Sequence, residues 1–396
     1  MSSQRQLFLQ HIAQVSPEPL AIEIDRARGS LLIDKKGKRY IDLISGISVS
    51  NLGHNYPEVT RAIQKQLKKY THVMVYGELV ESPQVLLATK LTQQLPEQLN
   101  SVYYVNSGNE AIDGALKLAK RTTGRAEIIS FQNAYHGSGQ GALSIMGDEY
   151  FKNAFRPLVP GNRIIRYNNT EDLEKIGCRT AAVVVEPVQG EGGYIPADKN
   201  WLTLLRNRCI EMGALLIFDE VQTGYGRTGK LFAFKNYDVI PDILCVAKGF
   251  GGGLPLGAFI SSKTIMDNLT NNPVLGHITT FGGHPLSCAA SLATLKVLLE
   301  KDYIEQVKPK EEQFRKLLIH PQIKNINGTG LMLAVEFESE ELNRKIIAKC
   351  LENGVFTDWF LINAKSMRIS PPLVIMKEEI KRSCKLILKS IDEVIS

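Results

Sequence analysis

The chain has 396 residues, of which 44 % are hydrophobic and 22 % are charged, so a disordered chain is excluded and a sizeable core is expected. The 47 lysines and arginines outnumber the 41 aspartates and glutamates, but they are scattered, which argues against a nucleic-acid-binding protein. No segment has the apolar length of a membrane span, and the N-terminus lacks a cleavable signal pattern.

The six cysteines are spread along the chain and form no CxxC pair. A metal cluster is therefore not predicted. Dispersed cysteines in a chain of this size fit a reducing compartment. We expect a cytoplasmic protein without a metal, whose partners include neither nucleic acid nor a membrane.

The first part of the chain predicts a helix or arm, then short strands, then two helices. Residues 1–21 form the helix or arm, and residues 21–42 contain turns and strands. Within them, residues 39–43 alternate between apolar and polar side chains as a strand does. Apolar residues recur with helical spacing over residues 57–70 and 82–94, which predicts a helix at each place.

The middle of the chain alternates strands with helices. A strand over residues 101–105 leads into a glycine-containing turn and a helix. Ser107 and Glu110 have the spacing of a capping box at its start, and Gly124 stops it. This alternation predicts a mainly parallel sheet with helices on both faces. Further strands are predicted at residues 127–131, 163–167, 181–186, 214–219 and 243–247, with helical stretches such as 201–212 between several of them.

The last part of the chain predicts a second, α+β layer. A long helix begins after His284 and runs to about residue 301, and a change of domain is expected within it. Strands are predicted near residues 328–337 and 367–370, with helices before, between and after them.

Two buried strands in the stretch 214–260 each end in a charge, Asp219 in one and Lys248 in the other. The carboxyl ends of parallel strands meet at one rim of a sheet, where ligands bind. A desolvated lysine is a nucleophile for a carbonyl, although Lys248 could instead extend its ammonium group out of the strand end. A buried Asp219 needs a partner such as a protonated pyridine nitrogen, or it caps a helix or pairs with an arginine.

The turn 106–109 opens a helix, and N–H groups at a helix start can hold a phosphate. Many such turns only cap the helix. Together, the turn, Asp219 and Lys248 would bind a phosphorylated pyridine aldehyde, with the phosphate at the helix end, the nitrogen at Asp219 and the aldehyde at Lys248. That ligand is pyridoxal phosphate.

From about residue 29 to 372 the chain resembles the class III aminotransferases of pyridoxal-phosphate fold type I, which include acetylornithine, ornithine and 4-aminobutyrate aminotransferases. The resemblance implies a mainly parallel central sheet in a large domain, and a smaller α+β domain formed by both chain ends. The expected division is an arm with part of the small domain over 1–48, the large α/β domain over 49–290 and the C-terminal α+β part over 291–396. The motifs that carry the resemblance include Asn106-Ser107-Gly108-Asn109-Glu110-Ala111, Tyr135-His136-Gly137, Glu186-Pro187-Val188-Gln189-Gly190-Glu191, Asp219-Glu220-Val221-Gln222-Thr223-Gly224, Lys248-Gly249 and Thr280-Phe281-Gly282-Gly283-His284-Pro285.

The resemblance also assigns roles in catalysis and cofactor binding. Lys248 would carry the cofactor covalently and then move a proton, and Asp219 would pair with the pyridinium nitrogen. Tyr135 would stack on one face of the ring and Val221 on the other, and Gln222 would hydrogen-bond the ring hydroxyl. The remaining residues expected to bind the cofactor are Ser107, Gly108, Asn109, His136, Glu186 and Thr280.

Thr280 would reach the phosphate held by the neighbouring subunit, so the resemblance implies a homodimer with shared active sites. Ser107, Gly108 and Asn109 would hold the phosphate of their own subunit. The family usually has Thr at the position of Asn109, where the backbone contact remains possible.

Four residues are expected to bind substrate. Arg368 matches the family's carboxylate-binding arginine, whose planar fork suits a carboxylate. Glu191 matches an acid that pairs with this arginine and releases it to a dicarboxylate such as 2-oxoglutarate. Ser138 stands where related members have an arginine for the donor's far carboxylate. Ile47 matches acetylornithine and 4-aminobutyrate members, whereas ornithine members have Tyr there, so the hints about the donor conflict.

We therefore expect an aminotransferase that moves an amino group, such as the terminal amine of an amino acid, to a keto acid by a ping-pong mechanism. Alternatives on the same scaffold are an ω-aminotransferase that uses pyruvate, an aminomutase, a decarboxylating transaminase, a racemase or a phospho-lyase. A cofactor-binding regulatory protein without turnover is the alternative from another class.

Overall fold

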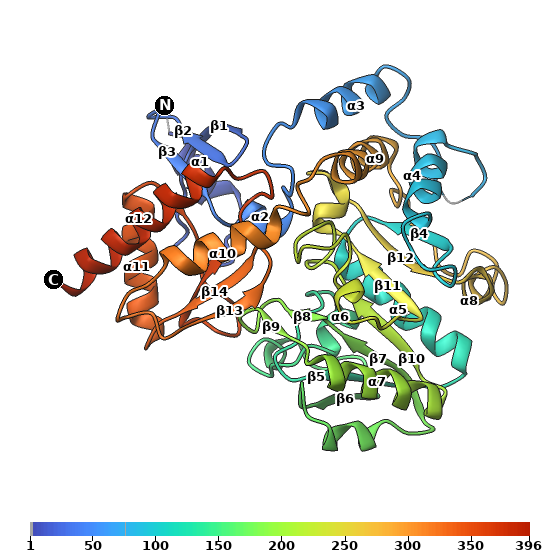
Figure 1. Ribbon diagram of the computed structural model, residues 1–396. Helices are drawn as coiled ribbons and strands as arrows, with labels where there is room; N and C mark the ends of the chain where they lie inside the picture. The colour runs from blue at the N-terminus through green and yellow to red at the C-terminus, as the bar shows by residue number, and fades with distance from the viewer. Residues whose placement is uncertain (1–2, 76) are drawn as a thin grey trace.

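The computed structural model describes residues 3–75 and 77–396. Its larger part is built on a seven-stranded sheet, and its smaller part contains both chain ends (Figure 1). In spatial order the sheet consists of β4 (Ser101–Val105), β12 (Gly257–Ser261), β11 (Ile243–Val246), β10 (Leu215–Asp219), β7 (Thr180–Val185), β5 (Glu127–Phe131) and β6 (Asn162–Ile165).

The sheet is mainly parallel, as predicted, but it contains one strand that the sequence analysis missed. β12 runs antiparallel to both of its neighbours, β11 and β4. The remaining neighbours, from β11 through β10, β7 and β5 to β6, pair in parallel. β12 is buried throughout, so it lacks the alternation of apolar and polar residues that marks a half-exposed strand.

Helices cover both faces of this sheet because successive strand residues point to opposite sides. Val183 and Val185 of β7 pack in one core cluster with Trp201 of α7 (Lys199–Met212). Ala182 and Val184 pack in the other cluster with buried residues of α5 (Gly108–Thr123). β7 is buried at all of its positions, as expected for a strand that helices cover on both faces.

α5 is capped at both ends by the residues that the sequence predicts. The Ser107 hydroxyl accepts from the Glu110 N–H at 3.2 Å. In a capping box the Glu110 side chain would accept from the N–H of Ser107. Here the Glu110 carboxylate instead accepts from the N–H of Asn106 at 2.9 Å. Gly124 ends the helix with a φ of 67°, a left-handed conformation that glycine adopts without strain.

The smaller part joins both chain ends in one sheet. β15 (Val355–Phe356) pairs in parallel with β3 (Arg39–Asp42), beside β2 (Leu31–Asp34) and β1 (Ile24–Arg28). A second, antiparallel sheet and four helices complete this part (Figure 1). They are β13 (Asn325–Thr329), β14 (Met332–Glu336), β16 (Ser366–Ile369), α1 (Gln4–His11), α10 (Val307–Leu317), α11 (Glu340–Glu352) and α12 (Lys377–Ile395).

Three helices pack together beside the large sheet (Figure 1), namely α3 (Pro57–Leu67), α4 (Ser82–Thr92) and α9 (Pro285–Glu300). The expected domain boundary at residue 290 would fall inside α9, and this boundary and the one at residue 48 remain proposals.

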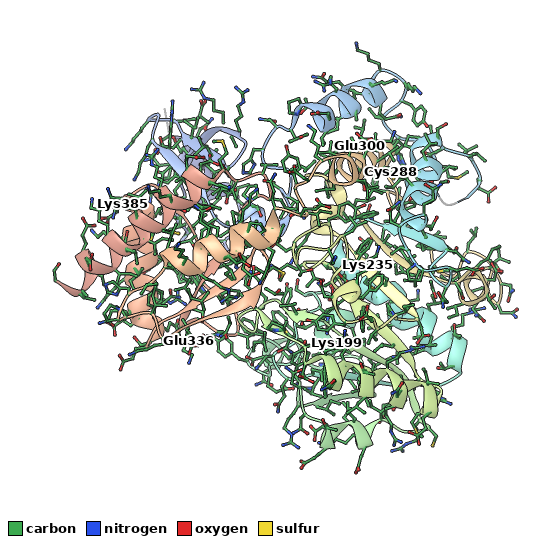
Figure 2. The ribbon with its side chains drawn as sticks, in the orientation of Figure 1. Lys199, Lys235, Cys288, Glu300, Glu336 and Lys385 are labelled. Carbon is green, nitrogen blue, oxygen red and sulfur yellow. The ribbon has the colours of Figure 1, made fainter. Side chains whose placement is uncertain are left out.

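Cys288 of α9 is buried, whereas the charged side chains of Glu300 and Lys385 lie at the periphery (Figure 2). The short elements are α2 (Ser45–Ser48), α6 (Gln140–Ser144), α8 (Lys263–Met266), β8 (Val188–Gln189) and β9 (Ile195–Pro196).

Within the described residues, none of the helices combines the length and the apolar character that crossing a bilayer requires.

Candidate active site

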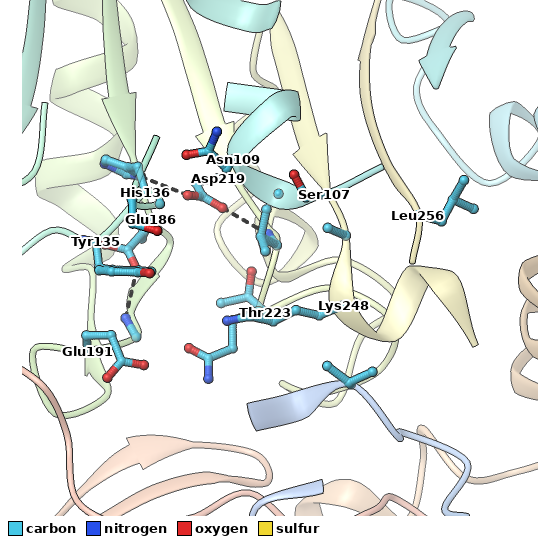
Figure 3. Close-up of a pocket in the computed structure, with 18 of the residues that line it drawn as sticks. Ser107, Asn109, Tyr135, His136, Glu186, Glu191, Asp219, Thr223, Lys248 and Leu256 are labelled. Carbon is cyan, nitrogen blue, oxygen red and sulfur yellow. Dashed lines mark hydrogen bonds and ion pairs between the residues drawn. The ribbon is translucent and has the colours of Figure 1, made fainter. Parts of the chain in front are cut away.

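The predicted carboxylate and amine line the same pocket, at the rim of the sheet where β10 and β11 end. Asp219 is in register with Cys245 of the neighbouring parallel strand, so Lys248 follows just beyond the same rim. A cavity of about 460 Å³ opens there (Figure 3). The predicted site residues that line it are Ser107, Gly108, Asn109, Tyr135, His136, Ser138, Glu186, Glu191, Asp219, Val221, Gln222 and Lys248.

Lys248 has an unusual backbone conformation, and its amine is desolvated. Its φ is 49°, a left-handed value that costs a residue with a Cβ about 1–2 kcal/mol and that surrounding packing must enforce. Desolvation lowers the pKa of Lys248, although the nearby Glu191 carboxylate opposes this shift. The net lowering of the pKa increases the fraction of Lys248 that carries a neutral, nucleophilic amine.

Asp219 is oriented by a buried histidine. Its Oδ2 lies 2.7 Å from Nδ1 of His136, and its Oδ1 accepts from the Val221 N–H at 3.0 Å. Burial by itself lowers the pKa of His136, but the hydrogen bond and charge of Asp219 outweigh it and raise that pKa. Asp219 thus neither caps a helix with its side chain nor pairs with an arginine, and the carboxylate is fixed at the pocket wall.

The start of α5 approaches the same rim very closely. A Cβ added to Gly108 would lie 2.8 Å from Cγ1 of Val221, so only glycine permits this approach. The first N–H groups of a helix lack a partner inside it, and those of Gly108 and Asn109 belong to pocket-lining residues. The Asn109 amide is already engaged, since its oxygen accepts from the Gly139 N–H at 2.6 Å and its nitrogen donates to Asp113 at 3.3 Å. Asn109 therefore offers an anion its backbone N–H.

Glu186 and Gln222 close the pocket beside Tyr135. The Glu186 carboxylate accepts from the N–H groups of Tyr135 at 3.2 Å and Gly190 at 2.8 Å. Burial raises the pKa of Glu186 to about 7. Gln222 donates to the Tyr194 hydroxyl at 3.2 Å. Tyr194 was not expected from the sequence, and no motif there marks it.

Arg368 lies behind Glu191 and is held by two carboxylates. Its Nη2 donates to both Glu191 oxygens, at 2.8 and 3.0 Å, and its Nε donates to Asp358 at 2.9 Å. Its Nη1 donates to the Tyr194 hydroxyl at 3.2 Å. Despite the cost of burial, Arg368 lowers the pKa of Glu191. Sequence reasoning found Arg368 and Glu191 but missed Asp358, because Asp358 reaches the guanidinium only where the segment before β16 folds back beside that strand.

Three expected site residues lie outside the pocket wall of their own chain. Thr280 is exposed, which is compatible with contact to another subunit. Ile47 is half-buried in α2 with a φ of 62°. Arg368 reaches the pocket through Glu191 rather than directly.

The residues present fit pyridoxal phosphate. One pocket brings together an amine for the aldehyde, a buried carboxylate for the ring nitrogen and a helix start for the phosphate, and it is large enough for the group. In the described part of the chain, no group of three or more His, Cys, Asp or Glu side chains is placed to hold a metal ion.

A mainly parallel sheet with these three features at one rim defines a pyridoxal-phosphate-dependent enzyme of fold type I. The profile of the family described as Aminotransferase class-III matches residues 12–391. The chain therefore belongs to the class III aminotransferases and is a pyridoxal-phosphate-dependent transaminase.

Individual relatives agree with this assignment. The chain is 38 % identical to an acetylornithine aminotransferase of Clostridium acetobutylicum, over 93 % of this chain and 96 % of the relative. It matches the structure of the ornithine aminotransferase from Toxoplasma gondii with a TM-score of 0.92 and 30 % identity, over 98 % of this chain and 93 % of the other. An (S)-enantioselective omega-transaminase from Thermomicrobium roseum matches with a TM-score of 0.92 and 27 % identity, over the full length of both chains.

Proposed function

We propose that the enzyme moves an amino group from a primary amine, such as the terminal amine of an amino acid, to a keto acid such as 2-oxoglutarate or pyruvate. In sum, the donor amine becomes a carbonyl compound and the keto acid becomes an amino acid. The observation that carries this proposal is the pocket where Lys248 and Asp219 lie at one rim, with the Glu191–Arg368 ion pair beside them.

Bound pyridoxal phosphate supplies an aldehyde that joins an amine and a ring that takes up electron density from the substrate carbon. Lys248 acts first as the amine that holds the cofactor and then as the base and acid that moves the proton at the reacting carbon. Its lowered pKa suits this task, because a base with a pKa nearer the working pH exchanges protons more readily.

Asp219 keeps the ring nitrogen protonated through its negative charge, and His136 keeps that carboxylate in place. The N–H groups of Gly108 and Asn109, together with Ser107, hold the phosphate at the start of α5. Tyr135 and Val221, which both line the pocket, would pack against the two faces of the ring.

Glu191 and Arg368 let one pocket serve two substrates. While the donor is bound, Glu191 neutralises Arg368 through the 2.8 Å ion pair. When a keto acid enters, its carboxylate takes the place of Glu191 on the guanidinium, since both groups use the same donor atoms.

The active enzyme is a homodimer in this proposal. An exposed apolar surface supports it, because apolar side chains gathered on one face of a protein mark an interaction site. The surface is a hollow lined by the exposed side chains of Val85, Val274, Leu275 and Ile278, and the exposed Phe281 follows shortly after Ile278 in the chain. Thr280 lies in the same segment and would serve the neighbouring subunit. The cytoplasmic location is also part of the proposal, supported by six cysteines without a disulfide in a large chain.

The test compares the parent enzyme with Lys248→Ala. The parent, purified with the cofactor, should absorb as a lysine-bound pyridoxal enzyme and pass amino groups to an added keto acid. Lys248→Ala should lose both the absorbance of the lysine-bound cofactor and the transfer. An isomerised, racemised or decarboxylated substrate without an aminated keto acid would instead assign one of the other reactions.

A further inference from the structure

Asp358 is a carboxylate beside the pocket to which the proposed reaction assigns no role. Its Oδ1 accepts from Nε of Arg368 at 2.9 Å, and its backbone carbonyl accepts from the Arg368 N–H at 2.8 Å. The Asp358 side chain is 25 % exposed, and it does not belong to the pocket wall. Asp358 therefore stays with Arg368 regardless of which substrate is present. Glu191, in contrast, lines the pocket and can give up its place on Arg368 to a substrate carboxylate.

Two carboxylates on one guanidinium leave this cluster with an excess of one negative charge. Glu191 uses both of its oxygens on Nη2, and Asp358 takes the Nε edge. Burial raises the pKa of Asp358 to about 6, even though Arg368 opposes the shift. Asp358 is consequently still ionised in most molecules at pH 7 to 8, and the excess charge is present under working conditions.

The rest of the pocket offers little to balance this charge. Among the described residues that line it, Lys248 is the sole lysine or arginine, and Lys248 is committed to the cofactor. Ser138, which also lines the pocket, brings no charge. The far end of an amine donor therefore meets an acid-rich wall.

We propose that Asp358 is a specificity-determining residue that makes the substrate end of the pocket negative, so that the enzyme selects donors with a second ammonium group, such as diamines and diamino acids, over donors that end in a carboxylate alone. The inference rests on the aminotransferase function proposed above and narrows its donor class.

The acceptor half of the reaction provides an internal comparison. A keto acid places its carboxylate where Glu191 was, on the same guanidinium. Asp358 repels the carboxylate of the keto acid and that of Glu191 almost equally. Its charge therefore hardly changes the free energy of exchanging one for the other. The charge of Asp358 should therefore act on the choice of donor and hardly on the binding of a dicarboxylate.

The test uses Asp358→Asn in the holoenzyme, because the amide oxygen can still accept from Nε of Arg368 while the charge is gone. Three four-carbon donors differ only at the far end: 1,4-diaminobutane is positive, butylamine is neutral and 4-aminobutanoate is negative. For the parent, kcat/KM of the donor half-reaction should be higher with diaminobutane than with 4-aminobutanoate. In the variant we expect roughly a fivefold fall for diaminobutane, a comparable rise for 4-aminobutanoate and little change for butylamine.

Two further measurements separate charge from structure. Calorimetric titration with glutarate, a dicarboxylate without a keto group, should give affinities within about twofold for parent and variant, since the effect cancels. Glu338→Gln removes an equal charge from an exposed side chain and should leave the donor order unchanged.

An equal change for all three donors in Asp358→Asn, or a parent enzyme that prefers 4-aminobutanoate, would overturn the proposal and leave Asp358 as an anchor of Arg368. Neither result touches the proposed function. That function fails only if the parent holoenzyme transfers no amino group from any donor to a keto acid.

Discussion

Replacement of Arg368 by leucine should destabilise the protein far more than an ordinary surface change, because it leaves two acids without their counter-ion. Arg368 is 1 % exposed, and the Glu191 carboxylate that it binds is almost as well buried. Removing one partner of a buried ion pair costs roughly 3–5 kcal/mol. At pH 8, the free energy of unfolding should fall by an amount in this range.

The loss should depend on pH in a defined direction. In the parent, Arg368 lowers the pKa of Glu191, so this acid contributes stability that is present above its unfolded pKa and disappears as the pH falls through its folded pKa. In Arg368→Leu, burial without a cation raises the pKa of Glu191 above its unfolded value, and the pKa of Asp358, which burial already raises to about 6 in the parent, rises further. The penalty then grows as the pH rises from the unfolded to the folded pKa, by about 1.4 kcal/mol per pH unit for each acid that stays protonated in the folded protein but is ionised in the unfolded chain.

Urea unfolding of the holoenzyme at pH 5.5 and pH 8 measures the effect. The difference between parent and Arg368→Leu should be smaller at pH 5.5, and Glu191→Gln added to Arg368→Leu should restore part of the stability at pH 8. Lys345→Ala is the matched control, since it breaks an exposed pair with Glu341 of 2.7 Å and should cost no more than about 0.5 kcal/mol at either pH. A loss in Arg368→Leu that is the same at both pH values would refute this electrostatic reasoning.

Two other predictions concern the cofactor and the dimer. Gly108→Ala places a methyl group 2.8 Å from Val221, so the start of α5 and Val221 must move apart. This shift disturbs the proposed phosphate site, and the Kd for pyridoxal phosphate from equilibrium dialysis should rise at least tenfold, or about 1.4 kcal/mol. Unchanged affinity would show that α5 does not contact the phosphate. Ile278→Asp puts a charge into the exposed apolar surface and should convert the proposed dimer to monomer in analytical ultracentrifugation while the far-ultraviolet circular dichroism stays the same. A dimer that persists in this variant would locate the interface elsewhere.

Much of the fold was predictable because its signals are local. The strands at residues 101–105 and 127–131 have the predicted bounds, since a short apolar run between turn residues needs no distant partner to be recognised. Ser107 and Gly124 cap α5 through contacts within a few residues of themselves. The reaction class was predictable for a related reason. Asp219 and Lys248 stand in short sequence motifs, and the order of these motifs along the chain is enough to indicate the family.

The resemblance implied the pair of Glu191 with Arg368, but the contacts of Arg368 with Asp358 and Tyr194 were not predictable in the same way. Asp358 is ten residues from Arg368 in the chain, Glu191 is 177 residues from it, and Tyr194 is 174 residues from it. Each of these pairs exists only because β16, the loops after β8 and the segment before β16 are packed together. A carboxylate at residue 358 has the same local sequence whether it binds a guanidinium or faces solvent.

From the amino-acid order alone came most strands of the large sheet, the caps of α5, the cofactor and the reaction class, because periodicity, capping and motif spacing are written within short stretches. The tertiary structure alone decided that β12 enters the sheet antiparallel, that His136 holds Asp219, and that Arg368 carries two acids. Charge balance in a pocket depends on which distant side chains meet there, and only the packed chain brings them together.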